Sequence, residues 1–277
     1  MKENLLRYLS AIIAIPIIIA VIQYGPFWLF ALLVCCAFFI AAYEWLDIYR
    51  ILGLAVPTLL GITFTVIGML SMYISIIDDR TFYILFWFFL VLCGICIYSI
   101  LRHGNSLKDM ISAMTGLLFS VSVIVMASGF LMLVRDEGNE VMGKGLVYLL
   151  LATAWIADAG AMHIGRLVGR HKLAPILSPN KTIEGFLAAI VCGFLGGLAI
   201  YFIYGFNFQV IWLFAIAPAV VTASHIGDLT ISLFKRAAKI KDSGHIIPGH
   251  GGFLDRLDNL LFSAPVFYLI IQMINGI

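Results

Sequence analysis

The chain has 277 residues, of which 62% are hydrophobic and 12% are charged, whereas a soluble domain has about 45–50% and about 25%. Its 17 Lys and Arg residues against 15 Asp and Glu residues leave a formal net charge of +2. This composition excludes a water-soluble globule, a disordered chain and a disulfide scaffold, and it gives no reason to expect a nucleic-acid partner. The expected solvent is a lipid bilayer.

Apolar runs long enough to cross a bilayer, about 20 residues each, recur along the chain. They predict an all-α polytopic integral membrane protein with about nine transmembrane helices. The predicted spans are residues 8–24, 27–43, 52–77, 82–101, 110–134, 145–164, 185–205, 208–234 and 260–274.

The positions of Lys and Arg predict the orientation, because short cytoplasmic loops retain positive charge. With the N-terminus in the cytoplasm, fourteen of these residues lie inside and three, Arg80, Arg135 and Lys144, lie outside. The polar loops after the sixth and eighth helices are then cytoplasmic.

The interiors of the first five predicted spans contain almost no ionisable residue, and the pattern changes from Trp155 onward. We therefore expect residues 1–144 to act as a scaffold or a homodimer surface, and residues 145–277 to carry the chemistry. Asp158 and Asp228 lie inside or near the end of apolar helices, where a carboxylate usually faces a partner or a wet cavity.

A polar stripe surrounds Asp228. Its members recur at spacings of four, four, three and four, which places them on one helix face; they are Ser224, Asp228, Ser232, Lys235 and Lys239. A functional site and a helix–helix hydrogen-bond seam are both consistent with this stripe.

The segment 232–260 combines cations with a glycine-rich turn. Glycines let backbone N–H groups approach phosphate oxygens, and Lys and Arg neutralise their charge. The segment therefore predicts a polyphosphate site. The residues concerned are Lys235, Arg236, Lys239 and Lys241, followed by Pro248, Gly249, His250, Gly251 and Gly252.

Asp255 and Asp258 are three residues apart at the expected start of the last helix, so both carboxylates can point to one side. Together with Asp228 they suit Mg²⁺, which takes one or two carboxylates and completes its shell with water and phosphates. A helix cap with a surface pair to Arg256 is the alternative.

The loop 165–185 carries a second, weaker set of basic and polar groups. Anionic headgroup binding and a purely topogenic role are both open for it. Its candidate binding residues are Arg166, Ser178, Lys181 and Thr182.

The stretch 232–258 closely resembles the signature of the phosphatidate cytidylyltransferases. The matching residues are Ser232, Lys235, Arg236, Lys241, Asp242, the turn 248–252, Asp255, Arg256 and Asp258, and upstream Gly227, Asp228, Ser178, Pro179, Lys181, Thr182, Glu184 and Gly185. The resemblance covers residues 155–258, and it leaves the role of Asp158 open.

The resemblance implies a multi-pass enzyme of the bacterial cytoplasmic (inner) membrane that joins CTP and phosphatidate into CDP-diacylglycerol and pyrophosphate at the cytoplasmic face. It implies catalytic roles for Asp228, Lys235, Asp255 and Arg256, and Mg²⁺ at Asp228, Asp255 and Asp258, with room for a second divalent or monovalent cation. CTP would be bound by Ser232, Arg236, Lys239, Lys241 and the glycine turn. The 166–181 loop would bind the phosphate of one substrate.

Two alternatives stay open at this point. A CTP-dependent lipid kinase of the polyprenol type would attack the γ-phosphorus and release CDP. An ion-coupled secondary transporter would use Asp158 and Asp228 as ion ligands.

Overall fold

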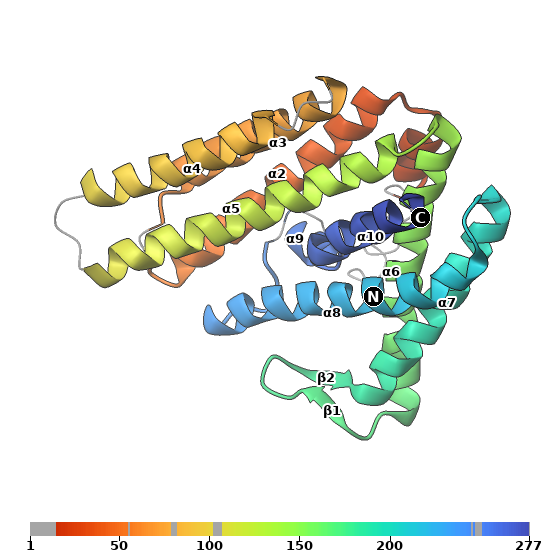
Figure 1. Cartoon of the computed structure of the whole chain (residues 1–277). Coiled ribbons are helices and arrows are strands. Elements are labelled where there is room, and N and C mark those ends of the chain that lie inside the picture. The colour runs from red at the N-terminus through yellow and green to blue at the C-terminus, as the bar shows by residue number, and fades with distance from the viewer. Residues whose placement is uncertain are drawn as a thin grey trace. The chain divides into compact units, whose positions relative to one another are not determined.

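The structure is a computed structural model that describes residues 15–54, 56–78, 82–101, 107–244, 246 and 251–276. Most of the described residues are helical (Figure 1). The helices are Ile15–Tyr24, α2 (Phe27–Ile51), α3 (Thr58–Asp78), α4 (Phe82–Leu101), α5 (Leu107–Asp136), α6 (Glu140–Val168), α7 (Ile183–Tyr204), the 3-10 turn η1 (Val210–Trp212), α8 (Leu213–Ala237), α9 (Leu254–Leu257) and α10 (Leu260–Asn275).

Within the described ranges, seven helical segments are long and apolar enough to cross a membrane. Helix is the expected solution, because a bilayer offers no water to satisfy backbone polar groups. The prediction of a polytopic helical membrane protein is confirmed at this level. Shorter apolar helices occupy Ile15–Tyr24 and Phe86–Tyr98. The start of the first predicted span lies outside the described residues, and the count of about nine spans stays a prediction.

The prediction of a loop after the sixth helix was wrong in one respect, because part of it forms a β-hairpin. Strands β1 (Lys172–Ala174) and β2 (Ser178–Thr182) pair antiparallel, with Lys172 opposite Thr182 and Ala174 opposite Ser178. The Thr182 Oγ1 accepts a hydrogen bond from Gly185 N at 3.1 Å and caps α7. The hairpin lies at the adjoining ends of α6 and α7 (Figure 1).

The chain divides into two compact units. The first comprises Met1–Met132 and Phe234–Leu257, and the second comprises Leu133–Leu233 and Asp258–Ile277. The division into residues 1–144 and 145–277 stays a prediction.

In the first unit, α2 packs against α3 and α9, and α3 packs against α4. An aromatic cluster on α2 holds the residue that precedes Lys235: the Phe234 ring lies 5.6 Å from Trp45 and 5.4 Å from Tyr49, between ring centroids. Trp45 also meets Phe119 edge to face. These contacts fix the last turn of α8 against α2 and thereby position Lys235.

In the second unit, α6 and α7 pack closely through small residues. A Cβ built at Gly193 would come within 2.9 Å of the Thr153 carbonyl oxygen. Ala157 and Ala189 are buried beside Val221 of α8. Small residues let two helix backbones approach each other in a bilayer, and here they support the helix that carries Asp228.

The polar stripe predicted on α8 ends earlier than expected. Lys239 has a φ of +57° and lies beyond the helix. The Lys239 N–H donates to the Arg236 carbonyl and the Ile240 N–H to the Lys235 carbonyl, the hydrogen-bond pattern of a Schellman C-cap. The prediction was wrong for Lys239, because the left-handed residue turns the chain out of the helix.

Candidate functional site

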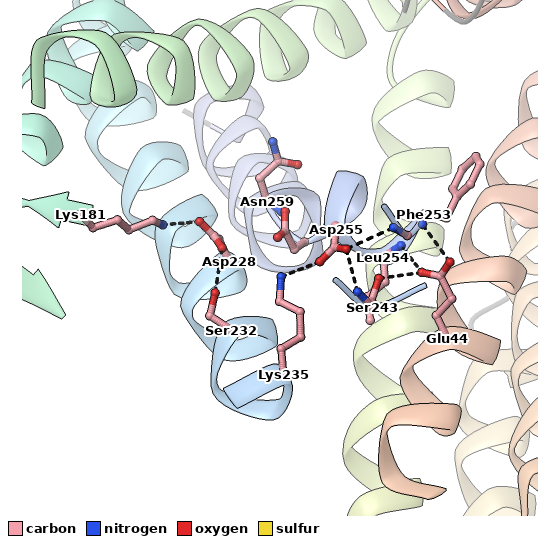
Figure 2. A network of polar contacts seen from close by, with 12 residues as sticks. Glu44, Lys181, Asp228, Ser232, Lys235, Ser243, Phe253, Leu254, Asp255 and Asn259 are labelled. Carbon is pink, nitrogen blue, oxygen red and sulfur yellow. Dashed lines mark hydrogen bonds and ion pairs between the residues drawn. The ribbon is translucent and has the colours of Figure 1, made fainter. Parts of the chain in front are cut away.

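Asp255 on α9 lies at the centre of a polar network in the first unit (Figure 2). Its Oδ1 accepts a hydrogen bond from Lys235 Nζ at 2.5 Å. Its Oδ2 accepts hydrogen bonds from Ser243 N at 2.8 Å and Gly252 N at 3.2 Å. The predicted residues Lys235, Gly252 and Asp255 are therefore brought together.

The Lys235–Asp255 pair is well shielded from solvent. The two side chains are 11% and 10% exposed. A buried ion pair is retained in good geometry when further hydrogen bonds satisfy its remaining atoms, and the two backbone N–H groups supply these to Asp255. The result is a fixed carboxylate with a cation against one oxygen.

Glu44 of α2 belongs to the same network, and the sequence reasoning missed it. Its carboxylate accepts hydrogen bonds from Ser243 Oγ at 2.8 Å, Phe253 N at 3.0 Å and Leu254 N at 2.8 Å (Figure 2). The residue is 3% exposed. The available signal was weak, because Glu44 directly follows the predicted span 27–43 and shares its helix with Asp47 and Arg50, as at the polar end of a membrane helix.

A second polar cluster in the second unit surrounds Asp228 of α8. Lys181 reaches from β2 and forms an ion pair with Asp228 Oδ2 (Figure 2). Ser232 Oγ, one turn further along α8, donates to Asp228 Oδ1 at 3.3 Å. The structure thus joins Lys181 from the loop after α6 to the α8 carboxylate that the sequence singled out.

Asp258 does not share the start of the last helix with Asp255, contrary to prediction. Asp255 lies in the short helix α9, and Asp258 lies in the turn before α10. Gly227 of α8 approaches the Asp258 carbonyl so closely that a Cβ at this position would overlap it. The missing side chain at Gly227 therefore allows α8 and this turn to meet.

The donor chemistry of these residues fits Mg²⁺. In the described part of the chain, no group of three or more His, Cys, Asp or Glu side chains is gathered for a metal. Magnesium needs one or two carboxylates, with water and phosphate as further ligands. Asp228 and Asp255 each form an ion pair with a lysine, Lys181 and Lys235 respectively.

One buried oxygen beside Asp258 also suits a cation or a water molecule. The Asn259 Oδ1 is buried and has no hydrogen-bond partner among the described residues. Buried polar atoms are normally satisfied, so a water molecule or a cation would be a suitable partner for this oxygen.

The other predicted binding residues are either exposed or take part in local secondary structure. Arg166, Arg236, Lys239, Lys241 and Arg256 are exposed, Ser178 pairs within the hairpin, and Thr182 caps α7. Gly251 has a φ of +82°, which favours glycine. Gly249 and His250 lie outside the described residues.

Comparison with known proteins agrees with the sequence resemblance. A sequence model of the Cytidylyltransferase family matches residues 5–274. Proteins named phosphatidate cytidylyltransferase are similar over nearly their whole length: one from Staphylococcus saprophyticus is 34% identical over 97% of this chain and 99% of its own, and one from Staphylococcus aureus is 32% identical over 96% and 98%. The chain belongs to the cytidylyltransferase family.

Proposed function

We propose that this protein is a phosphatidate cytidylyltransferase, which converts CTP and phosphatidate into CDP-diacylglycerol and pyrophosphate for phospholipid synthesis. Support comes from family membership and from the names of the relatives. The observation that carries the proposal is the shielded Lys235–Asp255 pair inside the segment that matches the family.

The reaction depends more on neutralising the negative charge of the phosphates than on a strong protein base. An ionised oxygen of the phosphatidate phosphate attacks the α-phosphorus of CTP and forms the new P–O bond. The bond from the α-phosphorus to the bridging oxygen breaks, and pyrophosphate leaves with the electron pair. Catalysis of such a transfer consists mainly of positioning and electrostatic stabilisation.

The residues of the network fit these tasks. Lys235, with Arg236, Lys239, Lys241 and the turn 248–252, would bind the triphosphate. Arg166, Lys181 and their hairpin would bind the phosphate of the lipid.

Asp228, Asp255 and Asp258 would hold Mg²⁺, with a second divalent or monovalent cation allowed beside it; the family resemblance supports this assignment. Bound Mg²⁺ would neutralise charge on the triphosphate and on the leaving pyrophosphate. Arg256 would stabilise the same charge as a catalytic residue.

The protein is proposed to lie in the bacterial cytoplasmic membrane, with its N-terminus and active site at the cytoplasmic face. The apolar helices and the bacterial relatives support a multi-pass membrane enzyme, and the distribution of Lys and Arg supports the orientation. A homodimer through the first half stays a prediction.

The purified protein should transfer label from [α-³²P]CTP into the lipid phase when phosphatidate and Mg²⁺ are present, and should release an equal amount of pyrophosphate. EDTA should abolish both signals, because hard-cation binding is part of the proposed chemistry. A product mixture with CDP and a newly phosphorylated lipid alcohol would instead establish the kinase. Ion-coupled solute flux into proteoliposomes without nucleotide would instead support the alternative of a secondary transporter.

Lys235→Ala should raise the KM for CTP by about 10–100-fold, because a hydrogen bond to a charged group contributes about 1.5–3 kcal/mol. Steady-state kinetics with varied CTP would measure the effect. Lys144→Ala is a matched control, since Lys144 also pairs with a carboxylate, Glu140, at 2.6 Å but lies outside the proposed site. An unchanged CTP dependence in Lys235→Ala would remove Lys235 from the triphosphate site.

A further inference from the structure

Glu44 is an acidic residue in the apolar helix α2, far in sequence from the segment that it contacts. The partners Ser243, Phe253 and Leu254 lie 199, 209 and 210 residues away. The residue is almost fully buried. A carboxylate in such a place is costly unless its oxygens are hydrogen-bonded, and here the partners all come from the segment that contains Asp255.

The chain around Glu44 is shaped to admit the carboxylate. A Cβ built at Gly244 would overlap Glu44 Oε1, and a Cβ built at Gly252 would overlap Glu44 Oε2. Both glycines therefore let the backbone close on the acid. The contact is a fitted pocket for one side chain, with hydroxyl and amide donors aimed into it.

Glu44 and Asp255 bind the same two stretches of chain through different donors. Ser243 donates its N–H to Asp255 and its hydroxyl to Glu44. In the second stretch, Gly252 N–H donates to Asp255, and the next N–H, from Phe253, donates to Glu44. Moving these stretches away from Glu44 would therefore move the donors that orient Asp255.

We propose that Glu44 is a positioning residue that holds the Ser243 and Gly252–Leu254 backbone, and through it Asp255 and Lys235, in the geometry that binds CTP. The proposal rests on the proposed function. Glu44 does not touch the substrates in this scheme. Its carboxylate ties the Ser243 and Gly252–Leu254 backbone to helix α2. Support of this kind keeps the positions of catalytic groups close to the productive geometry.

The test compares Glu44→Gln with the wild-type enzyme. A Gln side chain has the size of Glu, but its NH₂ group replaces one of the two accepting oxygens. At least one of the hydrogen bonds that Glu44 accepts is therefore lost. We expect the KM for CTP to rise about tenfold, in line with the loss of one hydrogen bond to a charged group. The KM for phosphatidate should stay within about twofold, because its proposed binding residues lie elsewhere.

Glu137→Gln is the matched control. Glu137 also accepts hydrogen bonds from side chains, Gln272 Nε2 at 2.5 Å and Asn275 Nδ2 at 2.9 Å, but it has no place in the proposed site. Its KM values should equal those of the wild type. A role of Glu44 in folding alone would lower the active fraction and leave both KM values unchanged, and that result would overturn the proposal.

Two further measurements keep the test decisive if Glu44→Gln folds poorly. Ser243→Ala removes one donor and should raise the KM for CTP in the same direction by a smaller factor; a normal value would contradict the proposal. The rise in melting temperature that CTP induces in detergent should be reduced in both variants, and an undiminished rise would also overturn it. If the wild type makes no CDP-diacylglycerol, the proposed function fails, while the CTP-induced melting shift still decides whether Glu44 positions a nucleotide site.

Discussion

Asp255→Asn should lower turnover by about 10³-fold, the size of effect expected when a group that stabilises transition-state charge is lost, here the cation that Asp255 is proposed to hold. Asp255 accepts hydrogen bonds from Lys235 on one oxygen and from two backbone N–H groups on the other. An Asn side chain must turn its NH₂ group toward one of these donors. The cation site and the position of Lys235 are then lost together, and label transfer from CTP to phosphatidate would measure the loss.

A loss of activity caused by unfolding has to be distinguished from the loss of a catalytic group in a folded protein. Asp255→Asn leaves the Lys235 ammonium buried without its partner, and breaking a buried pair in this way costs about 3–5 kcal/mol. The double variant Asp255→Asn with Lys235→Gln removes both charges, so its melting temperature should recover toward the wild-type value while activity stays absent. Near-normal activity in either variant would remove Asp255 from the catalytic site.

Asp228→Asn should lower turnover by about 10²–10³-fold with little change in stability. The Asp228–Lys181 pair is more exposed than the Asp255 pair, with side chains 28% and 19% accessible, and pairs of this kind contribute about 1 kcal/mol or less. The expected signature is a low kcat in a protein with a normal melting temperature. Activity and thermal unfolding measured on the same preparation would test this combination.

Asp136→Asn serves as the control for both aspartate variants. Asp136 ends α5, is exposed and has no place in the proposed site. Its activity should match the wild type. If Asp228→Asn retained full turnover, the Lys181–Asp228 pair would be a structural tie between the hairpin and α8.

The apolar runs were predictable because the bilayer constrains the local sequence directly. Each predicted span within the described residues overlaps a helix, and residues 82–101 coincide with α4. The ends of the helices were less predictable. Lys239 leaves α8 through a left-handed residue, and Asp258 falls in a turn, since capping hydrogen bonds decide where a helix stops.

The candidate site was predictable in its chemistry and only partly in its contacts. Lys235, Gly252 and Asp255 were singled out from one short segment, and the structure joins them. The pairing of Lys181 with Asp228 and the anchoring by Glu44 were not foreseen. Glu44 was missed because it directly follows the predicted span 27–43, together with Asp47 and Arg50, and this position does not indicate a distant partner.

The membrane class, the approximate helices and the family follow from the amino-acid sequence alone, because they depend on local hydrophobicity and on a compact signature. The tertiary structure decided which charges meet. Glu44 and Ser243 are 199 residues apart, and their contact depends on how α2 packs against α9. Local composition specifies what each segment buries, whereas the partner of a buried carboxylate is set by the packing of segments distant in the chain.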